Sequence, residues 1–376
     1  ALMASASFLI VAVSAFRMSP TDQGVGGFDL MAESSQPIYE NLNSEAGRKD
    51  LLADKAEELA GATVLSLRLK PGDDASCRNL YQPSQPRVLG VTPQMIKYFD
   101  DPKLPARFGW SASAAKTEEE RANPWRLLSA ETATDQPVPV VLDQNTAMYS
   151  LRLYGGVGET FAVTYGGGTK VQFRVAGLLA NSVLQGSLLI GEANFKRLFP
   201  QISGYRSFLI KSPPGKSERI AGVLEDRLGD EGFDTVDARA RLNDLLAVQN
   251  TYISTFQSLG ALGLVLGTFG LAAVQLRSVF ERRKELALMR AAGFRQGRLG
   301  EMVLLENLVL LIGGLALGAF AALVAVLPQM LLGAARVPLA DLAAMLGVVL
   351  VAGVATGFIA VRATLKAPLV GALRGE

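Results

Sequence analysis

The chain has 376 residues, of which 49% are hydrophobic and 19% are charged, and a chain of this length predicts more than one domain. Its net charge of +2 gives no global electrostatic signal for nucleic acid, so we predict no nucleic-acid partner. The sequence has no histidine, which removes the commonest metal ligand and the commonest general base. The single cysteine, Cys77, excludes an intrachain disulfide. We predict no catalytic, cofactor-binding or metal site in this chain; a carboxylate pair for glycoside cleavage stays open as an alternative, but the scattered Asp and Glu residues favour solvated surface charges.

The first apolar run, residues 1–16, is uncharged and ends at Arg17. It is shorter than the roughly 20 residues that a membrane span needs. One interpretation is the core of a signal peptide, with Val13-Ser14-Ala15 as a small-residue cleavage site. The other is a transmembrane helix that has lost its first turn, which we favour because no basic segment precedes the run. Residues 1–16 are therefore predicted to be a truncated first span.

Residues 17–244 have the mixed pattern of an α+β domain. Apolar residues at helical spacing predict helices at residues 45–59, 145–153, 192–198 and 217–228. Short alternating or continuous apolar runs predict strands at residues 62–69, 138–142, 161–165, 171–179, 188–190, 207–211 and 233–236. Gly166-Gly167-Gly168 lies between two of these strands and predicts a β-hairpin. Residues 100–135 are charged and Pro-containing, and we expect an irregular insertion or a surface helix there.

Three long uncharged runs follow, Leu245–Leu276, Asn307–Ala335 and Leu342–Val361, and each is long enough to cross a bilayer. Buried core helices of a soluble protein are the alternative interpretation. Three such runs in the last third of one chain favour membrane spans. With the truncated first run, the sequence predicts a membrane protein with four α-helical spans and one mixed α+β domain between the first two.

The distribution of basic residues predicts the orientation. The loop at residues 277–300 is rich in arginine, the tail at 362–376 carries three basic residues, and the loop at 336–341 carries only Arg336. Because Lys and Arg are retained on the cytoplasmic side, the basic loop and the tail are predicted to be cytoplasmic. The prediction is a multi-pass protein of the inner (cytoplasmic) membrane, divided as follows: span 1 at 1–16, extracytoplasmic domain at 17–244, span 2 with its lead-in at 245–276, cytoplasmic loop at 277–300, span 3 at 301–335, outer loop at 336–341, span 4 at 342–361 and cytoplasmic tail at 362–376. Arg17 lies on the outer side and is a single exception to the retention of basic residues on the cytoplasmic side.

Each of the last three spans contains two glycines four residues apart. Small residues at this spacing let helix backbones approach closely in lipid. Glycine is also simply commoner in membrane helices than in soluble ones, which is the alternative explanation. We predict close helix packing at Gly263, Gly267, Gly314, Gly318, Gly353 and Gly357.

The basic loop also carries a helical pattern. Residues 279–292 are good helix formers, Leu286, Met289 and Phe294 give an apolar stripe, and Gly293 predicts the end of the helix. Arg277 and Glu281 are four residues apart and are expected to pair. The amphipathic helix is compatible with the membrane surface, where its basic residues would contact anionic lipids. It is equally compatible with a groove on a cytoplasmic partner, and its periodicity does not distinguish the two.

At this segment a resemblance becomes specific. The run Glu281-Arg282-Arg283-Lys284-Glu285-Leu286-Ala287-Leu288-Met289-Arg290-Ala291-Ala292-Gly293-Phe294 resembles the cytoplasmic signature of FtsX-like permeases, which follows a span with E-R-x-x-E-[IL]-[AG]-x-[LM]-[RK]-A-x-G. The C-terminal Lys366-Ala367-Pro368 and Ala372-Leu373-Arg374 resemble the end of the same family. Val140-Val141-Leu142, Gly158-Glu159-Thr160 and Val175-Ala176-Gly177 resemble, more weakly, the strand order of MacB-type periplasmic domains. Residues 100–135 have no counterpart in this resemblance.

The resemblance implies the permease subunit of an ABC transporter of the mechanotransmission type, and no enzyme activity in this chain. The basic loop would be a coupling helix gripped by an ABC ATPase, with contacts from Glu281, Arg282, Arg283, Glu285, Leu286, Met289, Arg290, Gly293 and Phe294. The domain outside would then release or extrude a lipid-linked or bulky substrate. Other implied partners are membrane lipids, a second permease half or copy in a dimer, and an unidentified extracytoplasmic substrate or protein.

The glycine-rich turn Gly166-Gly167-Gly168-Thr169-Lys170 does not match the phosphate-binding pattern G-x-x-x-x-G-K-[ST]. We therefore expect no cofactor in this chain and ATP bound by the partner ATPase. A second function remains open, in which the same subunit relays the state of the ATPase to an outside partner such as a cell-wall hydrolase. It also stays open whether the chain is the second half of a longer permease.

Overall fold

The computed structural model describes residues 19–73, 75, 83–133, 135–166, 168–281, 285, 288–289, 292–331, 347, 350–351, 353–355 and 358. The chain divides into two compact units, which we call the α/β unit (residues 19–249) and the helical unit (the described residues from 250 onward). The boundary falls at residue 249 and not at the predicted 244, because the first turns of a long helix belong to the α/β unit. The predicted first span, outer loop and C-terminal tail lie outside the described residues.

The strands of the α/β unit form one mixed sheet. Among the described residues their order is β10-β1-β9-β2-β3-β8-β5-β7-β4, and β6 pairs with β7. The pairs β3–β8 and β5–β7 are parallel, whereas β1–β9, β2–β9 and β2–β3 are antiparallel. The bounds are β1 (Leu30–Ile38), β2 (Thr63–Lys70), β3 (Arg87–Val91), β4 (Trp110–Ser113), β5 (Val138–Asp143), β6 (Thr160–Tyr165), β7 (Thr169–Leu179), β8 (Ser187–Gly191), β9 (Tyr205–Lys211) and β10 (Asp234–Asp237).

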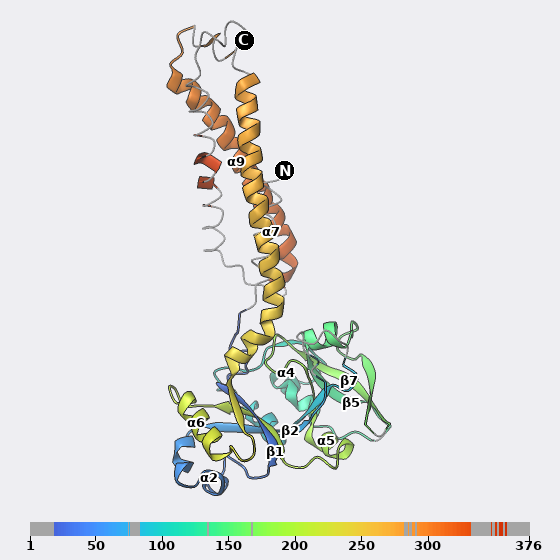
Figure 1. Cartoon of the computed structure of the whole chain (residues 1–376). Helices are drawn as coiled ribbons and strands as arrows, with labels where there is room; N and C mark the ends of the chain where they lie inside the picture. The colour runs from blue at the N-terminus through green and yellow to red at the C-terminus, as the bar shows by residue number, and fades with distance from the viewer. Residues whose placement is uncertain are drawn as a thin grey trace. The chain divides into compact units, whose positions relative to one another are not determined.

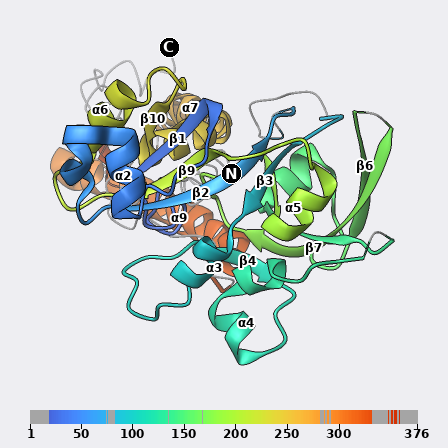
Figure 2. The ribbon, with the colours of Figure 1, turned by 90° about the horizontal axis from the view of Figure 1, so that it is seen from below.

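The first lobe is built on β10, β1, β9 and β2. Its helices are α2 (Glu45–Leu52), the 3₁₀ helix η1 (Ala53–Leu59) and α6 (Ser217–Arg227), which Figure 2 shows together at one side of the unit. The side chains of Leu52, Phe208 and Ile220 are fully buried in one core cluster between the helices and the sheet. The single helix predicted at 45–59 is divided because Ala53 adopts a left-handed conformation, with φ of 48°.

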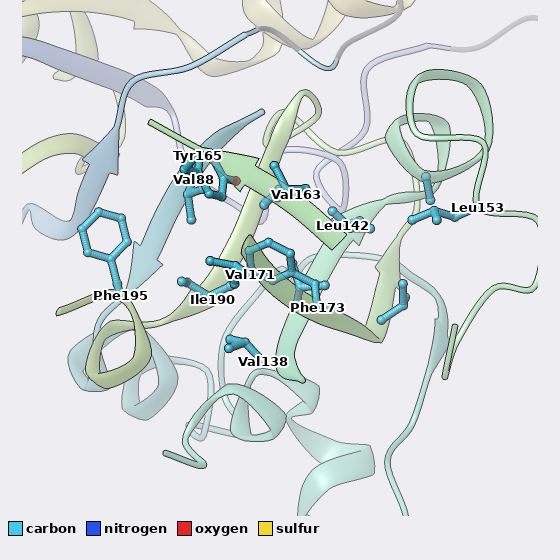
Figure 3. Packing of buried hydrophobic residues seen from close by; sticks show 14 of the residues in the cluster. Val88, Val138, Leu142, Leu153, Val163, Tyr165, Val171, Phe173, Ile190 and Phe195 are labelled. Carbon is cyan, nitrogen blue, oxygen red and sulfur yellow. The ribbon is translucent and has the colours of Figure 1, made fainter. Parts of the chain in front are cut away.

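The second lobe is built on β3, β8, β5, β7 and β6. Figure 3 shows its core, in which Val138, Phe173, Ile190 and Phe195 converge from three strands and from α5 (Glu192–Leu198). The predicted hairpin is confirmed, since β6 and β7 pair in antiparallel register. The predictions of β5 and α5 are also confirmed: β5 is a short apolar run that is buried throughout, whereas α5 is a mostly polar helix that buries Phe195.

Residues 100–135 are more ordered than an irregular insertion, and the surface helix expected as the alternative is present as one short helix. They contribute β4, which pairs with β7, the short helix α4 (Glu118–Ala122) and the 3₁₀ helix η2 (Pro124–Leu128). Trp125 is fully buried, and its ring packs against Phe108 and Trp110 with centroid distances of 5.7 and 5.1 Å. Phe108, Trp125 and Leu128 of this segment are buried, and their irregular spacing gives no periodic signal in the sequence.

Three further elements were not predicted. They are β1, β3 and the helix α3 (Pro93–Tyr98), which starts at Thr92, whose hydroxyl accepts a bond from the backbone of Met95. Strand β1 contains Ser, Gln and Pro and has low intrinsic strand preference, but it pairs with β9 and β10 on its two sides. Tertiary pairing therefore overrides local sequence at β1. The helix predicted at 145–153 is shorter, a π-helical turn η3 (Thr146–Ser150).

The helical unit contains most of α7 (Ala238–Glu281) and all of α9 (Gln296–Leu331), shown in yellow and orange in Figure 1. Helix α7 starts before the predicted residue 245 and ends beyond 276, and α9 starts before the predicted 301. In the part of the chain that is described, one helix is long and apolar enough to cross a membrane, Gly297–Ala321. The four-span topology therefore stays a prediction.

Leu304, Leu308 and Leu311 of α9 line an apolar groove with Gly353 and Val354.

Candidate functional site: the coupling segment and the base of the α/β unit

The end of α7 leads into the predicted coupling helix. The guanidinium Nε of Arg277 donates to the carboxylate of Glu281 at 2.8 Å, as the spacing of four residues predicts. Both side chains are exposed, so the pair contributes little to stability. Its position in the last turn of α7 holds Glu281, the first residue of the family-like run, in a helical conformation.

The coupling segment (residues 281–294) ends at a glycine cap. Glu285, Leu288 and Met289 are helical, and the backbone N–H of Ala292 donates to the carbonyl of Leu288 at 2.9 Å. The N–H of Phe294 then reaches back to the carbonyl of Met289 at 3.1 Å, across Gly293 with φ of 95°. This six-residue closure with a left-handed residue next to its end is a Schellman motif, which glycine adopts without steric cost. The helix end predicted at Gly293 is present in the structure.

Apolar side chains of this segment are exposed. Leu288 is 69% exposed and Phe294 55% exposed, and Met289 is half-buried. Leu288 is not among the predicted contacts, because it lies outside the apolar stripe of Leu286, Met289 and Phe294 in the sequence. Of the predicted contacts, Glu281, Glu285, Met289, Gly293 and Phe294 are described, and the remaining ones lie outside the described residues: Arg282, Arg283, Leu286 and Arg290.

At the other end of α7, its first turns pack into the α/β unit. Leu242, Leu245 and Leu246 are buried there. Leu242 contacts the base segment, which we define as residues 19–27 leading into the unit. A Cβ added at Gly24 of this segment would lie 2.5 Å from Cδ2 of Leu242 and 2.7 Å from the carbonyl oxygen of Asn181, so only glycine fits there.

The base segment links α7 to both lobes. The carbonyl of Gly24 accepts a bond from the N–H of Val183 at 2.9 Å, and the carbonyl of Gln23 accepts one from Gly109 at 3.1 Å. Asp22 forms an ion pair with Arg239 in the first turn of α7. The N–H of Ala238, where α7 begins, donates to the carbonyl of Asp29 just before β1. The two points at which the chain enters and leaves the α/β unit are therefore tied to each other and to the sheet.

A buried carboxylate lies next to this base. Asp143, at the end of β5, is fully buried and accepts bonds from the N–H groups of Ser182 at 2.6 Å and Asn145 at 2.9 Å. Burial raises the pKa of Asp143 to about 7, while the backbone donors, including Thr146, favour its ionised form. Asp143 thus fixes the loop that follows β7, the same loop whose Val183 bonds to Gly24.

The packing glycines differ in their surroundings. At Gly353 a Cβ would lie 2.6 Å from Cδ2 of Leu311, so α9 and the helical residues around Gly353 approach closely. Around Gly314 a Cβ would meet nothing within 4 Å. Gly267 and Gly318 are buried, Gly263 and Gly314 are half-buried, and Gly357 lies outside the described residues. Close packing is thus observed at one position, and for the others it stays a prediction.

Within the described residues, no group of three or more Asp, Glu, His or Cys side chains could hold a metal ion. The structure does show an exposed capped turn after the last turn of α7 and tight packing around its first turns.

Comparison with known proteins identifies the helical part. Residues 258–369 match the family model of the FtsX-like permease C-terminal region. Over these residues the chain is similar to FtsX-like permeases. This region includes the coupling segment, the whole of α9 and the residues around Gly353.

The chain is also similar to two proteins named macrolide export ATP-binding/permease protein MacB. The one from Hahella chejuensis (strain KCTC 2396) is 27% identical over 165 residues, which cover 42% of this chain and 23% of that protein. The one from Nitrosomonas europaea (strain ATCC 19718 / CIP 103999 / KCTC 2705 / NBRC 14298) is 31% identical over 101 residues, 27% of this chain and 15% of that protein. The similarity thus extends over less than a quarter of either relative.

Two solved structures align with the chain. The periplasmic region of MacB from Actinobacillus actinomycetemcomitans has 13% identity and a TM-score of 0.30, and covers 58% of this chain and 93% of that structure. The extracellular domain of the noncanonic ABC-type transporter YknZ from Gram-positive bacteria has 14% identity and a TM-score of 0.28, over 56% and 100% of the two chains.

Proposed function

We propose that the chain is a permease subunit of an ABC transporter of the mechanotransmission type. In this proposal an ABC ATPase partner binds the coupling segment at the cytoplasmic face of the membrane. ATP-driven movement of that segment passes along α7 to the extracytoplasmic α/β unit. The α/β unit then releases or extrudes a lipid-linked or bulky substrate. The FtsX-like region and the similarity to MacB sequences support the permease class.

The observation that carries the proposal is the capped, apolar coupling segment. Leu288 and Phe294 expose large apolar surfaces in a loop that the arginine distribution assigns to the cytoplasm. Exposed apolar side chains in a short helix are typical of a partner-binding helix that fits a groove. The Schellman closure at Gly293 fixes the end of this helix, so a partner would meet a preformed shape.

Helix α7 connects the coupling segment to the α/β unit. It runs without interruption from Ala238 to Glu281, with its first turns buried in the α/β unit and its last turn leading into the coupling segment. A continuous helix transmits a displacement better than a flexible linker would. Both chain crossings of the α/β unit are fastened at the same joint, through Gly24 and the Asp22–Arg239 ion pair.

The test is co-purification of the full chain with co-expressed ABC ATPases, comparing wild type with a Leu288→Asp/Phe294→Asp variant. Two carboxylates on the exposed apolar surface should abolish ATPase binding, because a groove that fits apolar side chains must then desolvate charge. The control is Tyr39→Asp, which alters an equally exposed apolar residue of the α/β unit. That variant should bind the ATPase like wild type.

Two results would contradict the proposal. One is wild type that co-purifies with no ABC ATPase. The other is a Leu288→Asp/Phe294→Asp variant that retains full binding and full stimulation of ATP hydrolysis. If the ATPase binds but no substrate moves, while a protein outside the membrane is activated, the chain is a signalling subunit and the transport part of the proposal fails.

A further inference from the structure

The segment after β5 (residues 146–154) presents two tyrosines and an arginine on the surface of the α/β unit. Tyr149 is 65% exposed, Tyr154 is 75% exposed, and Arg152 between them is exposed as well. The alternate residues of the same segment point inward. Ala147 and Leu153 belong to the core cluster of the second lobe, and Figure 3 shows Leu153 at the margin of that core. The segment is therefore firmly anchored, and only these three side chains project from it.

The backbone conformation of this segment separates the exposed side chains from the buried ones. The N–H of Leu151 donates to the carbonyl of Thr146 at 3.0 Å, and the N–H of Leu153 donates to that of Ala147 at 2.8 Å. Between these two bonds Arg152 adopts the left-handed region, with φ of 57°. That conformation is unfavourable for a side chain with a Cβ, by about 1 kcal/mol. Such strain in a non-glycine residue is a feature that often marks a functional surface.

The segment lies at the end of the α/β unit where the chain crosses into the helical unit. Thr146 accepts a bond from the N–H of Gly186 at 2.9 Å. The loop that contains Gly186 bonds through Val183 to Gly24 of the base segment, and Gly24 contacts Leu242 of α7. Both chain crossings, at residues 19 and 249, belong to this joint. Figure 1 shows the green turn of this segment at the same end of the unit as the first turns of α7.

We infer that Tyr149, Arg152 and Tyr154 form a contact with the phospholipid headgroups of the membrane surface that faces the α/β unit. Tyrosine concentrates at membrane interfaces because its ring is apolar and its hydroxyl is polar. An arginine guanidinium binds phosphate oxygens through two parallel hydrogen bonds, so Arg152 supplies the charge that complements the lipid phosphates. The inference rests on the proposed function only in that the helical unit spans the membrane.

The same unit offers a matched control residue. Tyr39 is 60% exposed and follows β1 directly. Strand β1 starts next to β10, which leads into α7, and it runs away from that end: Leu30 pairs with Asp237, and Ile38 pairs with Tyr205. Tyr39 is therefore an exposed tyrosine at the end of the unit opposite the chain crossings. If the segment contacts lipid, probes at positions 39 and 154 should differ in quenching by a headgroup label. If exposed tyrosines bind lipid nonspecifically, the two positions should be quenched equally.

The experiment uses the full chain in lipid nanodiscs that contain phosphatidylglycerol and a lipid with a nitroxide on its headgroup. A Cys77→Ser background removes the only native cysteine, and a fluorophore is attached at Tyr154→Cys or at Tyr39→Cys. The nitroxide lipid should quench the probe at position 154 at least about twofold more than the probe at 39, since only interfacial groups reach the headgroups. Adding Arg152→Gln should reduce quenching at 154 in discs with phosphatidylglycerol and leave the probe at 39 unchanged.

Equal quenching at the two positions would overturn the inference, and so would quenching at 154 that is insensitive to Arg152→Gln. If the surface instead binds a protein or a second copy, the probe at 154 is shielded from a water-soluble quencher but not quenched by the nitroxide lipid, and the lipid assignment fails. The ATPase co-purification is read separately on the same preparation. Failure of ATPase binding with intact lipid quenching removes the proposed function alone, and the reverse pattern removes the lipid contact alone.

Discussion

At the scale of single residues, the interface between the two lobes of the α/β unit contains a nearly buried ion pair. The Nε of Arg68 on β2 donates to the carboxylate of Glu192 at the start of α5 at 2.8 Å, and the two side chains are only 12% and 9% exposed. Burial opposes ionisation of Glu192, but the bonds from Arg68 and Lys196 hold its pKa below the ordinary value. The guanidinium also lies 5.2 Å from the ring centre of Tyr205. Arg68 therefore fastens the first lobe to the second.

This pair gives a prediction with an internal control. Arg68→Met should lower the free energy of unfolding by about 3 kcal/mol, because it leaves the buried charge of Glu192 without its main partner. Lys196→Met removes the second partner of the same carboxylate, but Lys196 is 55% exposed, so about 1 kcal/mol or less is expected. Denaturant unfolding of both variants measures the difference. Equal losses would mean that Arg68 has no special role in joining the lobes.

The buried Asp143 predicts a pH dependence of stability. Its pKa is about 7 in the folded chain, above the ordinary value of 3.8. Stability from this group is therefore complete below pH 4 and is lost as the pH rises toward 7. The total loss is roughly 4 kcal/mol, at 1.36 kcal/mol for each pKa unit. Asp73 and Asp100 have lowered pKa values, so the stability that they contribute is lost as the pH falls. They therefore change the stability only below pH 4.

Asp143→Asn tests this assignment. The amide cannot ionise, so unfolding measured between pH 5 and 7 should lose most of its slope. The variant should also be less stable at pH 5 by about 1–3 kcal/mol, because an amide NH₂ would face one of the backbone donors of Ser182 or Asn145. A variant with the same slope as wild type between pH 5 and 7 would assign the pH dependence to another group.

At the scale of elements, the coupling segment depends on its left-handed cap. Gly293→Ala forces a Cβ into a backbone with φ of 95° and should destabilise the helix end by about 1–2 kcal/mol. We expect weaker ATPase binding and reduced stimulation of ATP hydrolysis by the full chain. Gly297→Ala, four residues further on, has no positive φ and open space around it, and it should behave like wild type. Identical ATPase stimulation by the two variants would show that the cap is not needed.

The contact between Gly353 and Leu311 predicts a rescue experiment. Gly353→Ala should lower the thermal stability of the chain in nanodiscs, because the new Cβ would overlap Cδ2 of Leu311 at 2.6 Å. Combining it with Leu311→Ala should recover part of the loss. Gly314→Ala has no contact within 4 Å and should be neutral or slightly stabilising, since alanine is the better helix former. Failure of the rescue would indicate that the two helices do not meet at this point.

The elements that the sequence predicts correctly are those whose signal is local. The short buried run of β5, the helix α5, the β6–β7 hairpin and the glycine end of the coupling segment all depend on neighbouring residues. Strand β1 and the core residue Trp125 escape prediction because long-range pairing and ring packing fix them. The joint at Gly24 could not be predicted either, since the glycine meets Leu242 and Asn181 from distant parts of the chain.

At the scale of the whole molecule, we expect the coupling segment and the α/β unit to respond to each other. Helix α7 joins the two, and the base segment is hydrogen-bonded to the loop that follows β7. Movement of α7 relative to the sheet would have to disturb the bonds between Val183 and Gly24 and between Gly109 and Gln23. The helix α2, on the far side of the first lobe core, has no such link and serves as the reference.

Hydrogen–deuterium exchange of the full chain in nanodiscs with its proposed ATPase partner, with and without a non-hydrolysable ATP analogue, measures this response. We expect nucleotide to change the exchange of residues 21–27 and 181–186 while α2 stays constant, because opening of local bonds exposes their amides. The Leu288→Asp/Phe294→Asp variant should show no such change. Wild type that binds the ATPase and the nucleotide, yet shows unchanged exchange throughout the α/β unit, would mean that the two parts are not coupled.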